Sequence, residues 1–382
     1  MLTQEEKGLL QSYIDRSQPG MAYRKRVQIV LLADGGASAE SIAAELNIPV
    51  GRVRQFLRVF NRERLNLFPP PIFSRPQPFS PDDPLAEVGR RVMATLIEKA
   101  QSHEPDLRLE MDVFSIHETR KTCRRLRTSF RVFEPYYEPG VLRAYGKRFR
   151  KFMRHLGRSR DIAVFQINFE RYQNEVQNAG FMGDLERQSM AAFGEYWRAA
   201  QNKANENVRE YMAKGKYQRL IQDFDEFAHS AGRDAISWTE PTIPLKTRYT
   251  APIILYQKAA AVRVYEGYIK GASLEEHHSL RIQCKELRYS IEFFLPVLGP
   301  TAAAALSSLK RILTHLGDMN DARIALDLMA NVDDPALSPF LELYRQKNTG
   351  DLEALVADFS NLWSKLNQPE WRHALAEAIA VL

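Results

Sequence analysis

The 382-residue sequence predicts an all-α fold. Apolar residues recur every three or four positions through most of the chain, which is the spacing of an amphipathic helix, and no stretch alternates convincingly like a β-strand. A motif rich in cations also occurs twice, about 160 residues apart, and indicates a duplicated structural unit. We therefore expect two pseudo-symmetric four-helix bundles around a basic cavity, preceded by a small N-terminal helix-turn-helix domain.

Residues 1–65 are expected to form that N-terminal domain. Ser38 can cap a helix over residues 39–46, and the next helix, residues 49–62, opens with a proline, which a first turn tolerates. The tight connection resembles a helix-turn-helix, whose second helix would meet DNA. The side chains expected to point away from its apolar side are those of Arg52, Arg54, Gln55 and Arg58. A three-helix protein-contact module with solvated arginines is the alternative, and Gly51 weakens the DNA-contacting helix by about 1 kcal/mol.

Residues 66–84 are rich in proline and predict an extended spacer, which precedes repeats at about 85–230 and 251–382. Gly157 is expected to end one helix of the first repeat. The helices predicted for the first repeat are 85–102, 110–133, 141–156, 162–179, 185–212 and 217–228. Those predicted for the second are 251–270, 274–297, 302–316, 321–330, 339–347, 352–366 and 370–381.

The repeated motif places cations along one face of a helix. In its first copy the side chains that step by three or four residues are His117, Arg120, Arg124, Arg127 and Arg131. The apolar residues of this copy take a separate face, which a core would bury. The second copy keeps the histidine, the cations at +3, +7 and +10 and a cysteine at +6. Its polar members are His278, Arg281, Lys285 and Arg288.

A second cationic row is predicted between residues 143 and 160, where eight Lys or Arg occur without an acid. One helix face carries Arg143, Lys147, Arg150 and Arg154, with Lys151 beside them. The second repeat offers only Lys310 on the corresponding face, with Arg311 nearby. Guanidinium groups grip phosphate oxygens in pairs and ammonium groups add point charge, so the pattern favours a chain of oxyanions.

The alternative is that these cations form solvated faces paired with acids elsewhere in the chain. The duplication makes that interpretation less attractive. The histidines lie among many cations, so we expect them to resist protonation at neutral pH and to act as hydrogen-bond donors. An anion without bases or sugars needs no aromatic stacking platform, which single-stranded nucleic acid would favour.

Composition limits where such a protein works. The net charge of +6 suggests an anionic partner. Cys123 and Cys284 occupy equivalent positions on apolar faces and are expected to be buried free thiols. The N-terminus lacks an apolar signal core and the chain has no 18-residue apolar run, so we expect a protein of the reducing cytoplasm with no membrane partner.

A further motif is duplicated as well, at His155-Leu-Gly-Arg-Ser-Arg-Asp161 and His315-Leu-Gly-Asp-Met-Asn-Asp321. With the two cationic helices in the same order, residues 85–382 resemble the CHAD family, the conserved-histidine α-helical domain. The resemblance implies two four-helix bundles around a basic cavity that binds inorganic polyphosphate. It places the binding residues at His117, Arg120, Lys121, Arg124, Arg127, His278, Arg281, Lys285 and Arg288, with the row from Arg143 to Arg154 lining the same cavity.

Two departures from the repeat matter. Glu286 and Ile282 stand where the first copy has Arg125 and Lys121, so we expect the second cationic face to be weaker and the anion path to be narrowed or reoriented there. Many relatives also carry a triphosphate-tunnel domain, whose Glu-x-Glu-x-Lys signature this chain lacks.

We expect a binding protein without cofactor or metal, and not an enzyme. The chain has no Walker loop and no zinc-protease motif. Asp161 and Asp321 are expected to cap the helices that follow them, although they could hold magnesium with phosphate. The expected partner is polyphosphate, with DNA as a second partner of residues 1–65, at polyphosphate granules or the nucleoid. A metal-dependent enzyme that processes polyphosphate or nucleotides, and a protein that binds nucleic acid through both modules, are the alternatives.

Overall fold

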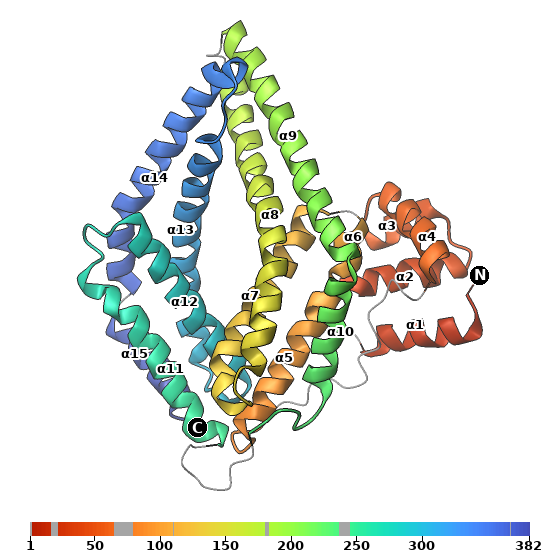
Figure 1. Ribbon diagram of the computed structural model, residues 1–382, viewed down its shortest axis with the longest axis vertical. Coiled ribbons are helices and arrows are strands. Elements are labelled where there is room, and N and C mark those ends of the chain that lie inside the picture. The colour runs from red at the N-terminus through yellow and green to blue at the C-terminus, as the bar shows by residue number, and fades with distance from the viewer. Residues whose placement is uncertain are drawn as a thin grey trace.

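The fold is all-α, as the sequence predicts. A computed structural model describes residues 2–16, 22–64, 79–109, 111–179, 183–236, 245–366 and 368–382 (Figure 1). Across these ranges the structure has helices and two isolated β-bridges, and no strand. None of the described helices is long and apolar enough to cross a membrane. Most of the predicted proline-rich spacer, residues 65–78, lies outside the described residues.

The N-terminal unit consists of α1 (Gln4–Arg16), α2 (Ala22–Asp34), α3 (Ala39–Leu46) and α4 (Val50–Glu63). It has a hydrophobic cluster of its own, which includes Val53, Phe56 and Phe60 of α4. The predicted cap forms, since the Ser38 side chain accepts a hydrogen bond from the Ser41 amide. Asn47 ends α3 in the left-handed conformation and makes the tight turn to α4. Whether this unit acts as a helix-turn-helix stays a prediction.

The remainder of the chain is built from long helices (Figure 1). The first half contains α5 (Leu85–Ser102), α6 (Glu104–Leu109), α7 (Val113–Phe133), α8 (Val141–Ala179), α9 (Asp184–Ala213) and α10 (Gly215–His229). The second half contains α11 (Thr247–Arg263), α12 (Leu274–Phe294), α13 (Ala302–Met329), α14 (Ser338–Leu366) and α15 (Pro369–Ile379). An ion pair between Arg26 of α2 and Asp106 of α6 links the N-terminal unit to the first half.

Three predicted helix breaks are wrong. Residues 141–179 form the single helix α8, which runs through Gly157, and α13 and α14 are likewise each one helix where two were predicted. A glycine costs a helix about 1 kcal/mol and does not by itself end it. A Cβ at Gly157 would stand 3.4 Å from Arg120 Nη1, the end of a flexible side chain. The predicted helix over 251–270 ends early, at Arg263, in a short 3₁₀ turn.

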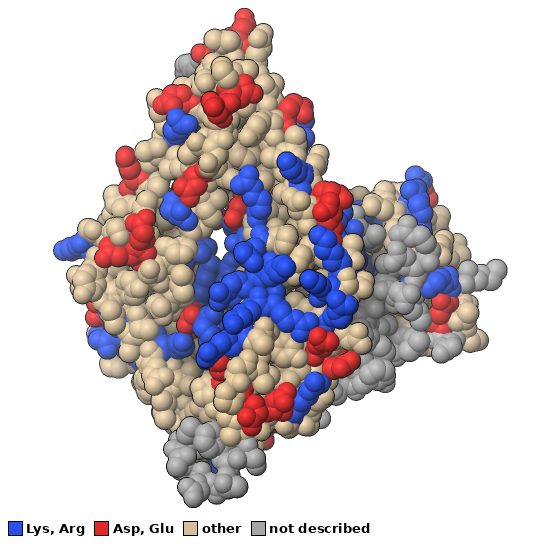
Figure 2. Space-filling view, in the orientation of Figure 1, with Lys and Arg blue, Asp and Glu red and all other residues tan. Residues whose placement is uncertain are grey.

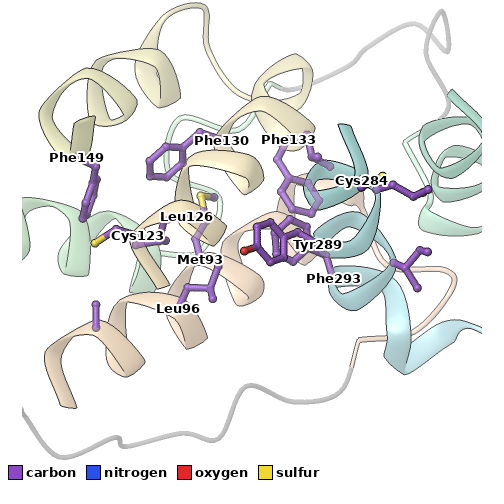
Figure 3. Close-up of a cluster of buried hydrophobic side chains, with 14 of the residues drawn as sticks. Met93, Leu96, Cys123, Leu126, Phe130, Phe133, Phe149, Cys284, Tyr289 and Phe293 are labelled. Atoms are coloured by element: carbon purple, nitrogen blue, oxygen red, sulfur yellow. The ribbon is translucent and has the colours of Figure 1, made fainter. Parts of the chain in front are cut away.

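The core places the two cationic helices side by side. The buried face of α7 carries Cys123, Leu126, Phe130 and Phe133, and Phe133 packs on Phe293 and Phe294 of α12 (Figure 3). Both cysteines are free and buried, and burial raises the pKa of each thiol to about 12. One hydrophobic cluster contains residues of both halves, and so does a second cluster between α8, α9, α13 and α14. The cores are therefore shared between the repeats.

The close packing of α5 on α7 depends on Gly89. A Cβ at this position would lie 2.7 Å from Cγ of Phe133, closer than side-chain carbons approach, so only glycine fits without moving the ring. The absence of a side chain at Gly89 therefore allows α5 and α7 to approach closely at this point.

Candidate anion-binding cavity

A cavity of about 420 Å³ lies between α7, α8, α12 and α13. Of its fourteen lining residues, eight are Lys or Arg, and none of those described is an acid. Figure 2 shows these cations as part of a broad basic region around a hollow in the middle of the molecule. A volume in the range of about 300–1,000 Å³ is typical of small-molecule pockets. The cavity is thus a concave site with one sign of charge.

Half of the residues predicted to bind polyphosphate line this cavity. The predicted residues that line it are His117, Arg120, Lys121, Arg124, Arg281, Lys285, Arg288 and Lys310. The lining residues that were not among the predicted site residues are Arg160, Tyr289, Leu313, Thr314, Asn320 and Ile324. Arg160 and Asn320 belong to the second duplicated motif, so the repeat itself carried the signal for both.

Cations of the first half are held by acids behind them. Arg120 donates from Nη1 to the Gly157 carbonyl at 3.0 Å and to Asp161 at 3.2 Å. Lys121 donates to Glu118 at 2.9 Å. These contacts orient the two side chains and offset part of their charge.

Four lining cations have no such partner among the described residues: the exposed Lys310, and three partly buried ones, Arg124, Arg281 and Lys285. Arg124, Arg281 and Lys285 make no ion pair and no hydrogen bond with any described residue, and Nε of Arg281 is buried. Burial, with Arg124 next in importance, lowers the pKa of Arg281 to about 10. Burial lowers the pKa of Lys285 to about 5, and the positive charges of Arg124, Arg281 and other arginines add to the effect. Without an anion, Lys285 is therefore neutral at pH 7.

Arg160 joins the two halves at the cavity wall. It donates two hydrogen bonds to Asp321 of α13, at 3.0 and 3.1 Å, and lies 3.4 Å from Asp161. Burial is the largest single influence on its pKa and lowers it, but the hydrogen bonds and charges of Asp321 and Asp161 together outweigh burial, so the pKa of Arg160 is raised. Asp161 and Asp321 therefore do not cap helices as predicted. Both lie inside continuous helices and serve as ion-pair partners.

The histidines that begin the two cationic motifs resist protonation, as expected. Burial and neighbouring cations lower the pKa of His117 and of His278, so both are mainly neutral at pH 7. His278 lies near Asn320, with 3.3 Å between Nδ1 and the amide oxygen, but it does not line the cavity. His315 lies 2.7 Å from the Leu355 carbonyl through Nε2, and His155 stacks on Tyr211. These two histidines hold helices together.

The predicted row on α8 is not part of the cavity. Arg143, Lys147, Arg150, Lys151 and Arg154 are exposed and none of them lines it. A continuous α8 explains the error, because their helix face turns away from the face that carries Arg160. Two other predicted residues are absent from the lining, Arg127, which faces Met153 of α8, and the exposed Arg311.

The two departures in the second repeat do not narrow the cavity. Glu286 pairs with Lys258 at 2.8 Å and Arg131 at 2.7 Å, and so links α12 to α11 and α7. Ile282 is 42% exposed. Neither residue lines the cavity, whereas Lys121, the counterpart of Ile282, does; the expected weakening of the second face stays a prediction.

No three His, Cys, Asp or Glu side chains within the described ranges come together in a way that could hold a metal ion. Among the described lining residues, Tyr289 is the only Phe, Tyr or Trp; it is buried and has the Arg125 guanidinium 5.7 Å from its ring centre. Tyr289 therefore offers no open face on which a base could stack.

Fold and site together define an all-α protein with a cluster of cations enclosed between its two halves. The chain belongs to the CHAD domain family, whose family model matches residues 91–330. A CHAD domain structure from the plant Ricinus communis is similar over 77% of this chain and 96% of its own, with a TM-score of 0.62 and 18% identity. PptA from Streptomyces chartreusis matches over 74% of this chain and 100% of its own, with a TM-score of 0.51 and 15% identity. These likenesses concern the fold. A sequence comparison with curated proteins gave no match.

Proposed function

We propose that this protein binds inorganic polyphosphate in the cavity between α7, α8, α12 and α13. The observation that carries the proposal is the group formed by Arg124, Arg281 and Lys285, three basic side chains that share the cavity and have no acidic partner among the described residues; burial and the neighbouring arginines leave Lys285 uncharged until an anion binds. Like charges held together in a partly buried site repel one another, which costs folding free energy. An anion with closely spaced charges would remove that cost.

Phosphate suits this lining better than a carboxylate or a nucleic acid. Arg124, Arg281 and Arg288 can each donate two parallel hydrogen bonds to a phosphate oxygen pair, and the lysines can follow a chain of oxygens. Thr314 and Asn320 add neutral hydrogen-bonding groups to the wall. Bases and sugars would meet a lining without an open aromatic face. The family resemblance supports the same ligand.

The test is calorimetric titration of the full chain with polyphosphate. We expect the Arg124→Ala/Arg281→Ala/Lys285→Ala variant to bind at least about a hundredfold more weakly, because each charge-assisted hydrogen bond contributes about 1.5–3 kcal/mol. The matched control is Arg187→Ala/Arg198→Ala/Arg345→Ala, which removes three exposed cations that pair with acids on α9 and α14. Equal losses in the two variants, with the helical signal intact, would refute a specific site.

We further propose that the protein binds polyphosphate without turning it over. Positioning water for attack on a phosphoryl group needs a metal or a base, and two acids that contact the cavity wall, Asp161 and Asp321, are engaged by Arg120 and Arg160. Phosphate release by the purified protein in the presence of Mg²⁺ or Mn²⁺ would contradict this.

The N-terminal unit is proposed to tether the cavity to DNA. Gln55 and Arg58 are exposed on the face of α4 opposite its buried residues, as are Arg52 and Arg54, although Arg54 pairs with Glu40 of α3. We expect a cytoplasmic protein found at the nucleoid or at polyphosphate granules. Loss of duplex-DNA binding in full-length Arg52→Ala/Arg58→Ala, with polyphosphate binding unchanged, would support the tether. Unchanged DNA binding would remove it.

A further inference from the structure

The exposed cations on α8 form a second basic feature outside the cavity. Along one face of the helix lie Lys147, Arg150, Lys151, Arg154 and Arg158, here called the α8 stripe. All five are exposed, and none makes an ion pair or hydrogen bond with a described residue. The stripe runs from Lys147 to Arg158, twelve residues of helix, which is about 16 Å at ~1.5 Å rise per residue.

Acids near the stripe pair with its neighbours instead. Glu134 accepts a hydrogen bond from Arg143 at 3.1 Å, and Asp223 of α10 accepts one from Arg148 at 2.8 Å. Lys214 is a further cation near the stripe. Burial lowers the pKa of His155, and the charges of Lys151, Lys214 and Arg154 lower it further, so all three lie close to this histidine. The charge around His155, beside the stripe, is therefore positive. A face solvated only for solubility would more often alternate in sign.

Arg127 connects the stripe to the cavity. It lies one turn beyond Arg124 on α7 and reaches across to α8, where its Nη1 is 4.0 Å from the Met153 sulfur. Arg127 is half-buried, and burial followed by the charges of Arg131, Arg150 and Arg124 lowers its pKa. Its charged neighbours thus include one cavity residue and one stripe residue. Figure 2 shows Lys and Arg gathered around the central hollow.

We propose that a long polyphosphate chain leaves the cavity past Arg124 and Arg127 and continues along the α8 stripe. The enclosed part would hold a few phosphates by oriented hydrogen bonds, and the stripe would hold the emerging chain by charge. This rests on the proposed function of the cavity and adds chain-length discrimination to it. A short oligophosphate would fill the cavity alone, whereas a long chain would gain the exposed contacts as well.

The test compares two ligands on the full chain, tripolyphosphate and long-chain polyphosphate, each titrated at several salt concentrations. The stripe variant is Lys147→Gln/Arg150→Gln/Lys151→Gln/Arg154→Gln, whose members are all exposed, so the fold is retained. The matched control is Arg187→Gln/Arg198→Gln/Arg263→Gln/Arg345→Gln, four exposed cations on α9, α11 and α14.

We expect the stripe variant to bind long-chain polyphosphate more weakly by about tenfold to a hundredfold, and its slope of log affinity against log salt to fall by about 3, at ~0.7 per phosphate neutralised on a flexible chain. Tripolyphosphate affinity should change by less than about twofold, as should both affinities in the control.

Three outcomes would overturn the proposal. Unchanged long-chain affinity would show that the stripe is only solvated. Equal loss for both ligands would show that it acts through the general field of the protein. Duplex DNA that binds the Arg124→Ala/Arg281→Ala/Lys285→Ala variant and is lost in the stripe variant would assign the stripe to nucleic acid. Wild-type protein that binds neither phosphate ligand would refute the cavity function as well, so the two failures are distinguishable.

Discussion

Helices α7 and α12 carry the same motif, but the cations of the two copies differ in their ion-pair partners and surroundings. At +3 from the histidine, Arg120 is paired with Asp161, whereas Arg281 has no partner among the described residues. At +10, Arg127 turns toward α8, whereas Arg288 lines the cavity and donates to Glu292 at 2.9 Å. Only the +7 pair, Arg124 and Lys285, has the same outcome in both copies.

The two copies therefore agree better on which cations line the cavity than on which acids pair with those cations. Pairing depends on the helix packed behind each motif. In the first half α8 places Asp161 next to Arg120, and in the second half the equivalent acid, Asp321, is taken by Arg160 from across the cavity. Arg281 is thereby left without a carboxylate. The second copy, which looks weaker in sequence, supplies two of the three partly buried cavity cations that have no acidic partner among the described residues.

The largest effect is expected from removing either of the arginines at +3 from the histidine, Arg281 or Arg120. Arg281→Ala is expected to weaken polyphosphate binding by about 2 kcal/mol, or roughly thirtyfold, and to leave the melting temperature unchanged or raised because an unpaired buried charge is removed. Arg120→Ala should also lower stability by about 1–2 kcal/mol, because Asp161 loses a partner. Thermal unfolding without ligand, run beside calorimetry, measures both. A lower melting temperature for Arg281→Ala than for Arg120→Ala would contradict the comparison.

The lysine at +7 in the second copy, Lys285, should make polyphosphate binding depend on pH. Lys285 has a pKa of about 5 without ligand, and a bound polyanion would raise it, so binding should take up a proton. Affinity should therefore rise as pH falls toward 5, by up to about tenfold per pH unit for one proton. In the absence of ligand the unfolded chain holds this proton and the folded chain does not. The free energy of unfolding should then increase with pH between about 5 and ~10, the ordinary lysine value.

Calorimetry at pH 8 in buffers of different ionisation enthalpy counts the protons, and there the histidines contribute little. Lys285→Met should abolish the uptake. Lys310→Met, which removes another lysine from the cavity lining, should weaken binding and leave the uptake intact. Uptake that persists in Lys285→Met would show that another group titrates.

Much of this site could be predicted from sequence, because helical spacing dictates which side chains share a face. The spacing of His117, Arg120 and Arg124 placed all three correctly in the cavity lining. The burial of Cys123 and Cys284 followed from the same periodicity. The all-α class required only the apolar repeat and the lack of strand alternation.

Other features depend on contacts that no local pattern contains. Gly157 was expected to end a helix, but α8 runs through it. Because the helix continues, Arg160 keeps a fixed rotation relative to the α8 stripe, and it lines the cavity while the stripe lies on another face. The pairing of Asp321 with Arg160 joins residues far apart in the chain and was not predictable from either motif alone.

The smallest effect should come from restoring the repeat at +4, where α7 has Lys121 and α12 has Ile282. Adding a cation by Ile282→Lys is expected to change polyphosphate affinity by less than about twofold, because Ile282 is 42% exposed and lies outside the cavity lining. Titration at low salt, where any added charge has its greatest effect, gives the strictest test. Lys121→Ala should cost more than Ile282→Lys gains, since Lys121 lines the cavity even though Glu118 holds it. A gain of tenfold from Ile282→Lys would mean that the anion path reaches the outer face of α12, and the comparison between the two copies would have to be redrawn around that face.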